Sequence, residues 1–449
     1  MINNNISERI TYADVATKDD GSNGASEKML AETQSSTKEN KDQCKPSPEY
    51  KEIIDLLIDS YYDPSAIKEQ DKLRSKYDCQ IKNQDDAITY ADKAIEELNL
   101  PYTDLYTKTE LDVMTSDIAG KYYGVGMSLT NIDRPGSKSR TRVDELAPGG
   151  AAETAGLQRG DQILRIDGQD VSTFNHKEVS SLIRSDKAAP LSITVYRDGE
   201  EKTFENVQRR LIESSAVKDP TMTDGIVHVT VTTFAQEDTS DELKAALEKF
   251  PDAKAFIIDL RHNNGGLVQE ALRSLSLFMG SGKLMTEQQR ISARDGGSEG
   301  EATYVNKDFN LTPDKIAVRK YFPDFPGIEG IAPSVPRHKD IVDKPVVILT
   351  DEMTASASEI FSAAMKDHKE ATLIGTKTLG KGIGQDLYQG LPGGAGMAIT
   401  TMRIYSPNKH WVGDGAEERY GIEPDIEVQK TENAVEVARN FLKTKMQTK

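Results

Sequence analysis

The residue types that could carry chemistry begin with a serine. In the segment VVILTDEMTASASEIFSAAM, Ser356 follows an apolar strand that ends at Thr350, and it stands where a helix begins. The first N–H groups of a helix have no intrahelical acceptor, so the N–H of Ala357 is suited to bind an oxyanion beside a serine nucleophile. For this stretch alone, the commoner interpretation is that Thr354, Ser356 and Ser358 only cap the helix.

A serine nucleophile needs a base, and a lysine is the best candidate in this chain. The six histidines stand in no recognisable motif with Ser356. A lysine can replace histidine if burial lowers the pKa of its amine from about 10.4 toward neutrality. In GTKTLGKGIGQ, Lys381 lies between two glycines that allow close backbone approach. Gln385 follows four residues later, where its amide oxygen could hold the amine.

The same segment has a second interpretation, a phosphate-binding loop. Gly375, Gly380 and Lys381 fit most of a Walker pattern. Gly382, however, stands where that pattern has the Ser or Thr that binds magnesium. We therefore prefer the catalytic interpretation of Lys381.

A third segment, IIDLRHNNGGLVQEA, is typical of a strand, an Asn- and Gly-rich turn and a helix. Gly265 and Gly266 could present a backbone N–H to a reacting carbonyl oxygen. In isolation, an ordinary strand-to-helix turn is the better explanation of the two glycines.

These segments belong to a chain of 449 residues, which is long enough for two or three domains. A net charge of −17 argues against a nucleic acid partner. No apolar run reaches the roughly 18 residues that a membrane-spanning helix needs. Two cysteines, Cys44 and Cys79, cannot form a disulfide framework or a four-cysteine zinc site. The expected partner is a small molecule, a peptide or a protein.

Three composition changes divide the chain. Residues 1–47 are polar and without apolar period, and we predict them to be disordered. They also lack the apolar stretch of a secretory signal, so either the protein stays where it is made or a signal is absent from this sequence. From Tyr50 onward, apolar residues recur at helical spacing, which predicts a helical region over 48–120.

Residues 121–205 carry β signals, with Asn175 as the N-cap of one helix and a hairpin around Asp198-Gly199. Residues 206–449 indicate an α/β domain, because AFIIDL, VVILTD and ATLIG are typical of strands that are covered on both faces. Within this domain, residues 283–340 are polar and of low periodicity. We predict that they form an insertion over the surface, with a place beside the active site as one option.

In this order, the segments resemble the C-terminal processing peptidases, the tail-specific serine proteases of peptidase family S41. LAPGGAAETAGLQRGDQILRIDGQDV is similar to the family's PDZ signature, DLRHNNGG to DLRNNPGG, TASASEI to GSASASEI and TLGKGIGQ to TFGKGxVQ. PYTDLYTKTELDVMTSDIAGKYYGVGM and YGIEPDIEV resemble the motifs before the PDZ domain and at the end of the core. The resemblance covers roughly residues 85–430. Thr354, His262 and Asn264 differ from the Ser, Asn and Pro of the family motifs.

The resemblance implies an α/β core of the ClpP/crotonase-like type with an inserted β-rich PDZ domain and an N-terminal helical region. It implies a serine endopeptidase that cleaves proteins near or from their C-termini, without metal or cofactor. It also implies an extracytoplasmic location, in the periplasm or cell envelope. The implied site residues are the nucleophile Ser356, the base Lys381, its orienting partner Gln385, and the oxyanion-hole residues Ala357, Gly265 and Gly266.

The implied PDZ domain would bind the C-terminal tail of a substrate and gate the active site. Its two-glycine turn offers N–H groups to a terminal carboxylate, the next strand offers an edge, and an apolar helix forms the other wall. The expected groove residues are Tyr123, Gly124, Val125, Gly126, Met127, Val179, Leu182 and Ile183. We therefore expect protein or peptide substrates with free, apolar C-terminal tails. The alternative is a self-occupied groove in a domain that acts only as a spacer.

Two other functions stay open at this point, a catalytically silent PDZ scaffold on an S41 fold and an acyl-CoA enzyme of the crotonase-like kind. The presence of Ser356, Lys381 and Gln385 together argues against the scaffold. The PDZ signature and the glycine-flanked lysine argue against the acyl-CoA enzyme. The sequence leaves the oligomeric state open, including a homo-oligomer.

Overall fold

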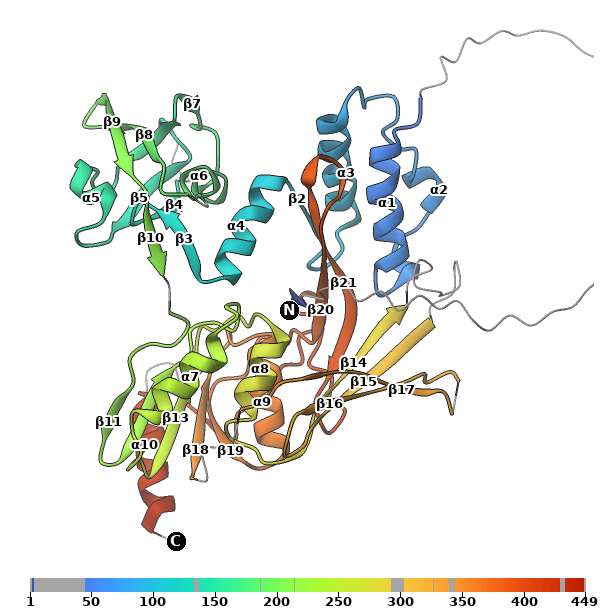
Figure 1. The fold of residues 1–449 in the computed structure, drawn as a ribbon, viewed down its shortest axis with the longest axis vertical. Helices are drawn as coiled ribbons and strands as arrows, with labels where there is room; N and C mark the ends of the chain where they lie inside the picture. Colours follow the sequence, from blue (N-terminus) through green and yellow to red (C-terminus); the bar gives the residue numbers. More distant parts are fainter. Residues whose placement is uncertain are drawn as a thin grey trace, which may run out of the picture.

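The computed structural model describes residues 2–3, 45–132, 137–185, 187–213, 215–291, 303–325, 327–338, 344–428 and 433–447. Figure 1 shows N-terminal helices beside a long pair of strands, a small β-rich domain, and an α/β core that carries the C-terminus. The segment predicted to be disordered, residues 1–47, lies outside the described residues apart from Ile2–Asn3 and residues 45–47.

The N-terminal helical region starts with α1 (Pro48–Ser60), whose N-cap Ser47 accepts a hydrogen bond from the N–H of Tyr50. The apolar faces of α1 and α3 pack on each other and on strand β21 (Gly396–Tyr405). The prediction of a purely helical region missed strand β2 (Asp104–Tyr106), which pairs with β21 and attaches this region to the core. The other helices are α2 (Gln70–Leu73), α3 (Gln84–Leu98) and α4 (Lys108–Ile118), with a 3-10 turn at Pro64–Ala66.

The small domain is an antiparallel sheet in the order β4-β5-β6-β8-β9, with β7 paired to β6. Asp198 and Gly199 join β8 to β9 with positive φ values of 54° and 91°, as the predicted tight hairpin requires. Asn175 accepts a hydrogen bond from the N–H of Glu178 at 3.1 Å, as predicted for an N-cap. The elements are β4 (Met127–Asn131), β5 (Thr141–Leu146), α5 (Ala151–Ala155), β6 (Gln162–Ile166), β7 (Gln169–Asp170), α6 (His176–Ile183), β8 (Pro190–Arg197) and β9 (Glu200–Gln208).

A two-stranded ribbon connects this domain to the rest of the chain. Strands β3 (Lys121–Gly124) and β10 (Arg210–Glu213) pair antiparallel, one before and one after the domain (Figure 1). The chain therefore enters and leaves this inserted domain through the same ribbon.

The α/β core contains a sheet in the order β11-β12-β13-β18-β19-β22, which is parallel except for β11. The predicted strands AFIIDL, VVILTD and ATLIG are β13, β18 and β19. Helices α7, α8 and α9 cover one face of the sheet and α10 covers the other, so these strands are apolar throughout. The elements are β11 (Thr221–Thr223), β12 (Ile226–Thr230), α7 (Thr239–Glu248), β13 (Ala255–Asp259), α8 (Val268–Leu275), β18 (Val346–Thr350), α9 (Ala357–Asp367), β19 (Ala371–Gly375), β22 (Ile426–Glu427) and α10 (Ala434–Gln447).

A second large sheet has the order β1-β20-β21-β14-β15-β16-β17. Residues 283–340, predicted to be an irregular surface insertion, contain most of four of its strands. The prediction missed them because their exposed side chains are polar, which hides the alternation. The elements are β1 (Ile2–Asn3), β14 (Gly282–Ile291), β15 (Thr303–Leu311), β16 (Ile316–Tyr321), β17 (Glu329–Val335) and β20 (Ile383–Tyr388), with a 3-10 turn at Pro392–Gly394.

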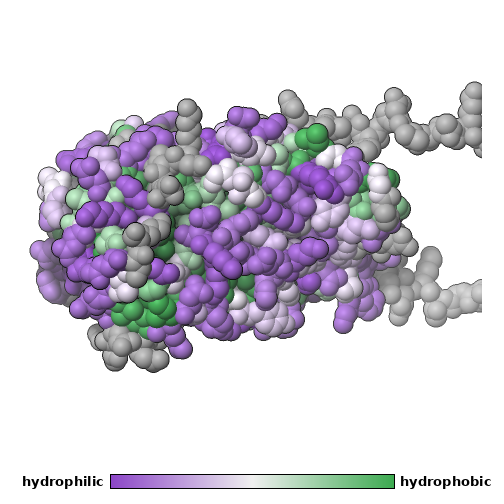
Figure 2. Space-filling view, turned by 90° about the horizontal axis from the view of Figure 1, so that it is seen from below, coloured by the Kyte–Doolittle hydropathy of each residue, from purple (hydrophilic) through white to green (hydrophobic). Residues whose placement is uncertain are grey.

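The surface seen from below in Figure 2 is mostly hydrophilic, with a few hydrophobic patches. This agrees with a chain in which 29% of the residues are charged. Within the described ranges, no helix combines the length and the apolar character needed to cross a lipid bilayer.

Candidate active site

Ser356 stands between strand β18 and helix α9, where the sequence predicts a nucleophile. Its backbone has the unusual φ and ψ values of 63° and −121°. Strain of this kind costs about 1–3 kcal/mol and persists only where the surrounding structure enforces it. The residue is 1% exposed. Its Oγ makes no hydrogen bond to any residue that the structure describes. The hydroxyl therefore does not cap the helix, which argues against the helix-cap interpretation of this serine.

The carboxylate of Glu359 connects the serine segment to the lysine segment. It accepts hydrogen bonds from the N–H groups of Ser356, Gly380 and Lys381, each at 2.8 Å, and from Oγ1 of Thr378 at 2.6 Å. Glu359 is 2% exposed, and burial raises the pKa of its carboxyl. Four donors on one buried carboxylate fix the position of Ser356 relative to the backbone of Lys381.

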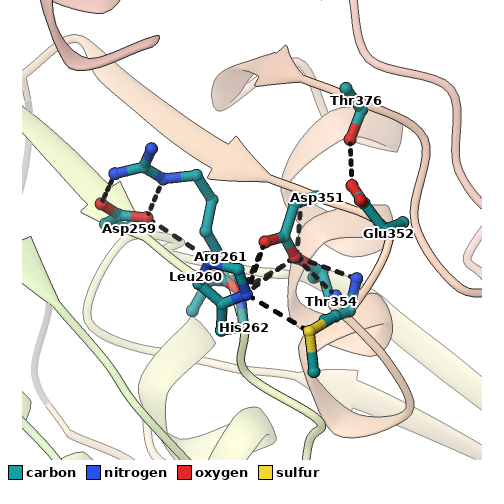
Figure 3. Close-up of polar contacts among 9 residues, drawn as sticks. Asp259, Leu260, Arg261, His262, Asp351, Glu352, Thr354 and Thr376 are labelled. Atoms are coloured by element: carbon teal, nitrogen blue, oxygen red, sulfur yellow. Dashed lines mark hydrogen bonds and ion pairs between the residues drawn. The ribbon is translucent and has the colours of Figure 1, made fainter. Parts of the chain in front are cut away.

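A second carboxylate connects the serine segment to the glycine turn (Figure 3). Asp351 accepts hydrogen bonds from the N–H of His262 at 3.0 Å and from the N–H of Thr354 at 3.0 Å. Oγ1 of Thr354 donates to the carbonyl oxygen of Leu260 at 2.9 Å. Thr354 thus holds the two turns together.

The strand that leads into the glycine turn ends in an ion pair. Arg261 binds both oxygens of Asp259, at 2.9 and 2.7 Å (Figure 3), and His228 lies 3.1 Å from the same carboxylate. Burial raises the pKa of Asp259, but the hydrogen bonds from Arg261 and His228 outweigh it and lower the pKa to about 2. The carboxylate stays charged and anchors the start of the turn.

The glycine turn lies directly against Ser356. A Cβ on Gly265, whose φ is +95°, would come within 2.6 Å of the Ala355 oxygen and 2.7 Å of Cβ of Ser356. Only glycine fits this approach. The Gly265 N–H donates to Oδ1 of Asn263 at 2.9 Å, whereas the N–H groups of Gly266 and Ala357 donate to no residue that the structure describes.

Lys381 lies at the edge of the same site, just before β20. Its Nζ is 3.3 Å from Oε1 of Gln385, the predicted partner, and 3.7 Å from the centroid of the Tyr102 ring. Burial lowers the pKa of the Lys381 amine to about 8, against the opposing charges of Asp104 and Glu359. No hydrogen bond joins this amine to the Ser356 hydroxyl, so the predicted dyad is not aligned in this structure.

Two hollows meet at these residues. A small, largely apolar cavity is lined by Ser356, Lys381, Leu284, Ile360 and Val412, among others. A cleft of about 350 Å³, which shares Lys381 with the cavity, is lined by Gly265, Gly266, Gln385 and Tyr102, among others. Across the described ranges, no cluster of three or more His, Cys, Asp or Glu side chains could hold a metal ion.

The predicted residues of the PDZ groove differ in their burial and in their place relative to strand β4. Gly124, Val125 and Gly126 precede β4, which is an edge strand beside α6, and Tyr123 exchanges two backbone hydrogen bonds of 3.0 Å with Ser185. Val125, Val179 and Ile183 are buried in the core of the domain. Met127 and Leu182 are partly buried against this core.

Sequence reasoning missed four residues of this site. Asn263, Asp351 and Tyr102 act through contacts with distant segments, which no local pattern indicates. Glu359 had a local signal, because a serine followed three residues later by Glu is a capping-box spacing. That pattern predicts the bond from Glu359 to the Ser356 N–H, but not the bonds to the lysine segment.

Glu359→Gln should destabilise the protein, because an amide offers one acceptor oxygen in place of two and turns an NH2 group toward buried N–H donors. We expect the free energy of unfolding to fall by about 2–3 kcal/mol, measured by urea denaturation. Glu370→Gln is the matched control, since Glu370 is exposed just after the same helix, and its effect should stay below about 0.5 kcal/mol. Equal effects of the two substitutions would contradict the bridging role.

The comparisons with known proteins agree with this architecture. A model of peptidase family S41 matches residues 225–428, and a PDZ-domain model matches residues 115–196. The "Probable CtpA-like serine protease" of Staphylococcus haemolyticus is 27% identical over 339 residues, 75% of this chain and 59% of that protein. The "Carboxyl-terminal-processing protease" of Synechocystis sp. is 28% identical over 369 residues, 80% of this chain and 75% of that protein.

Among solved structures, the photosystem II D1 C-terminal processing protease is 22% identical, with 85% of this chain and 92% of that chain covered and a TM-score of 0.48. The chain spans about three fifths of the length of the staphylococcal relatives that it matches. The two family models fall on the α/β core and on the inserted β-rich domain, in the order that the motifs predicted. By these matches, residues 225–428 form a peptidase family S41 region and residues 115–196 form a PDZ domain.

Proposed function

We propose that this protein is a serine endopeptidase that cleaves protein substrates near or from their C-termini, with Ser356 as nucleophile and Lys381 as general base. The observation that carries the proposal is the pairing of two unusual groups beside one cleft. One is a buried serine hydroxyl without a hydrogen-bond partner among the described residues. The other is a buried lysine whose pKa is lowered to about 8, near the working range of a general base.

In the proposed reaction, the neutral Lys381 amine takes the proton from Oγ of Ser356 while Oγ attacks the scissile carbonyl carbon. The Ala357 N–H and an N–H of the Gly265-Gly266 turn stabilise the oxyanion. The Lys381 ammonium then protonates the leaving amine, and the C–N bond breaks to leave an acyl-enzyme. Water attacks this ester with Lys381 again as base, which releases the new carboxyl group and restores the serine. The amine must move from its present position toward Oγ before the first step.

Gln385 is proposed to orient the base. Its Oε1 faces the Lys381 amine, and its Nε2 donates to Oγ1 of Thr400 at 3.3 Å. Since Oγ1 of Thr400 donates in turn to the Pro101 oxygen at 2.8 Å, the amide is fixed with its oxygen toward the lysine.

An extended peptide is the substrate form that fits this site best. Strand β20 begins two residues after Lys381, and its outer edge is paired in parallel with the chain's own β1, Ile2 opposite Gln385. A free edge strand binds extended backbone in this way. The apolar cavity beside Ser356 is suited to an apolar side chain next to the scissile bond.

The PDZ domain is proposed to capture the substrate tail and to gate the site. Strand β4 has an unpaired edge in its sheet, and the N–H groups of Val125 and Gly126 before it donate to no described residue. These groups are suited to a terminal carboxylate, with the tail as an added strand.

An extracytoplasmic location is proposed from the state of one cysteine. Cys79 is disulfide-bonded, and structural disulfides persist mainly in oxidising compartments. The other cysteine of the chain, Cys44, lies outside the described residues.

Ser356→Ala and Lys381→Ala should each lower kcat/KM on an unfolded protein substrate by at least about a thousandfold, and the double variant should lose little more. For the unaltered protein, kcat/KM should rise with pH up to about 8 and then level off, because the base must be neutral and its pKa is about 8. Lys377→Ala is the control, since this lysine is paired with Glu423 at the surface. A fully active Lys381→Ala variant would exclude this lysine as the base.

Amidation of the substrate's C-terminus should raise KM severalfold with little change in kcat, because it removes the charge that the PDZ turn binds. The comparison uses one unfolded substrate with an apolar tail, as free acid and as amide. In a Leu182→Asp variant the difference between the two forms should shrink. Equal rates for acid and amide would make the domain a spacer.

Cys79 should react with iodoacetamide only after reduction when the protein is isolated from its native cells without reductant. Peptide mass spectrometry measures the modification, and a sample treated with dithiothreitol is the control. Complete alkylation before reduction would argue for a reducing compartment.

A further inference from the structure

The Lys381 amine has an aromatic neighbour that the proposed reaction does not use. Its Nζ lies 3.7 Å from the centroid of the Tyr102 ring, well inside the range of a cation–π interaction. The side chain of Gln385 lies on the amine as well. Tyr102 belongs to the segment before the PDZ domain, far from Lys381 in sequence.

Tyr102 is held firmly in this place. Its backbone has a φ of 53°, which is rare for a residue with a Cβ, and its hydroxyl donates to the Gly415 oxygen at 3.0 Å. A Cβ on Gly415 would lie 2.7 Å from that hydroxyl and 2.9 Å from Cβ of Lys381. The three residues are therefore packed against one another, with a glycine where no side chain fits.

Two adjacent residues, Pro101 and Tyr102, support the contacts that Gln385 and the aromatic ring make with the Lys381 amine. The Pro101 oxygen accepts the bond from Oγ1 of Thr400, which accepts in turn from Gln385. Tyr102, the next residue, supplies the ring. A displacement of Pro101 and Tyr102 would thus alter both contacts of Lys381 together.

We propose that Tyr102 is a positioning residue that holds the charged form of the Lys381 side chain beside Gln385. Through this contact, the position and ionisation of the Lys381 amine depend on the segment that leads to the PDZ domain. This inference rests on the proposed function in that Lys381 is the base. The segment continues through β2 into α4, and α4 contacts β3 and α6, so a movement of the PDZ domain has a short path to the ring.

The effect on ionisation has a definite sign. An aromatic face stabilises an ammonium over a neutral amine, so the ring opposes the lowering of the Lys381 pKa by burial. Among the residues that the structure describes, the other charged groups around the pair are Asp104 on β2, Glu359 on α9, and Asp414 and Arg419 on the loop that contains Gly415. None of them changes in a Tyr102 variant.

The test measures the Lys381 pKa directly in the inactive Ser356→Ala background, by competitive acetylation with acetic anhydride across pH and peptide mass spectrometry. Tyr102→Leu keeps the apolar bulk without the ring and should lower the pKa of Lys381 by about one unit. Tyr102→Phe keeps the ring without the hydroxyl and should leave the pKa nearly unchanged. Tyr106→Leu removes another tyrosine of the same cleft and should also leave it unchanged.

In the active protein, Tyr102→Leu should lower the plateau of kcat/KM by about tenfold and shift its pH profile to lower pH, while Tyr102→Phe should lose less than about threefold. An unchanged Lys381 pKa in Tyr102→Leu, or equal losses in the Leu and Phe variants, would overturn the proposal. If Tyr102→Leu fails to fold by circular dichroism, Tyr102→Met takes its place under the same criteria. An active Lys381→Ala variant would refute the role of Lys381 as the base. The labelling experiment needs no turnover, so the Lys381 pKa measured in the Tyr102 variants would still decide whether Tyr102 positions the amine.

Discussion

The site depends first on one buried carboxylate. Glu359 accepts hydrogen bonds from three backbone N–H groups and one hydroxyl, and these donors come from the serine turn and the lysine loop. A buried charge is costly unless it is fully hydrogen-bonded, so this carboxylate is stable only while both segments stay in place. The same bonds hold Ser356 in its strained backbone conformation. Glu359 therefore couples the position of Ser356 to that of the Lys381 backbone.

Asp351 extends this arrangement to the glycine turn. It binds the N–H of His262 on one side and that of Thr354 on the other, so the turn that carries Gly265 is fixed against Ser356. The close approach at Gly265 leaves no room for a side chain. The backbone around the serine is thus rigid, whereas the Lys381 side chain rests on Gln385 and Tyr102 and has not reached the serine hydroxyl. In the proposed mechanism, the Lys381 side chain must therefore move toward Ser356 while the surrounding backbone stays in place.

Two opposing effects act on that side chain. Burial favours the neutral amine, whereas the Tyr102 ring and the nearby Asp104 and Glu359 favour the ammonium. The ring comes from the segment that joins the N-terminal helices to the PDZ domain. In the proposal made above, the ionisation of Lys381 is therefore linked to the segment between these two regions through the contact between the Lys381 amine and the Tyr102 ring.

The sequence alone determined the parts of this protein whose cause is local. Apolar runs predicted β13, β18 and β19, because strands covered on both faces need apolar residues throughout. The strand-to-helix turn marked Ser356 as a candidate site residue, and the flanking glycines marked Lys381. The strands of residues 283–340 were missed because their polar exposed faces hide the period. Val179 and Ile183 were expected in the groove, yet they lie in the core of the PDZ domain, since one apolar helix face serves both purposes and only packing separates them. Tertiary structure alone decided that Nδ2 of Asn263 donates to the Val231 oxygen, that Glu359 joins two segments and that Tyr102 faces Lys381. These contacts join residues that are distant along the chain, and local spacing carries no information about which distant groups folding brings together.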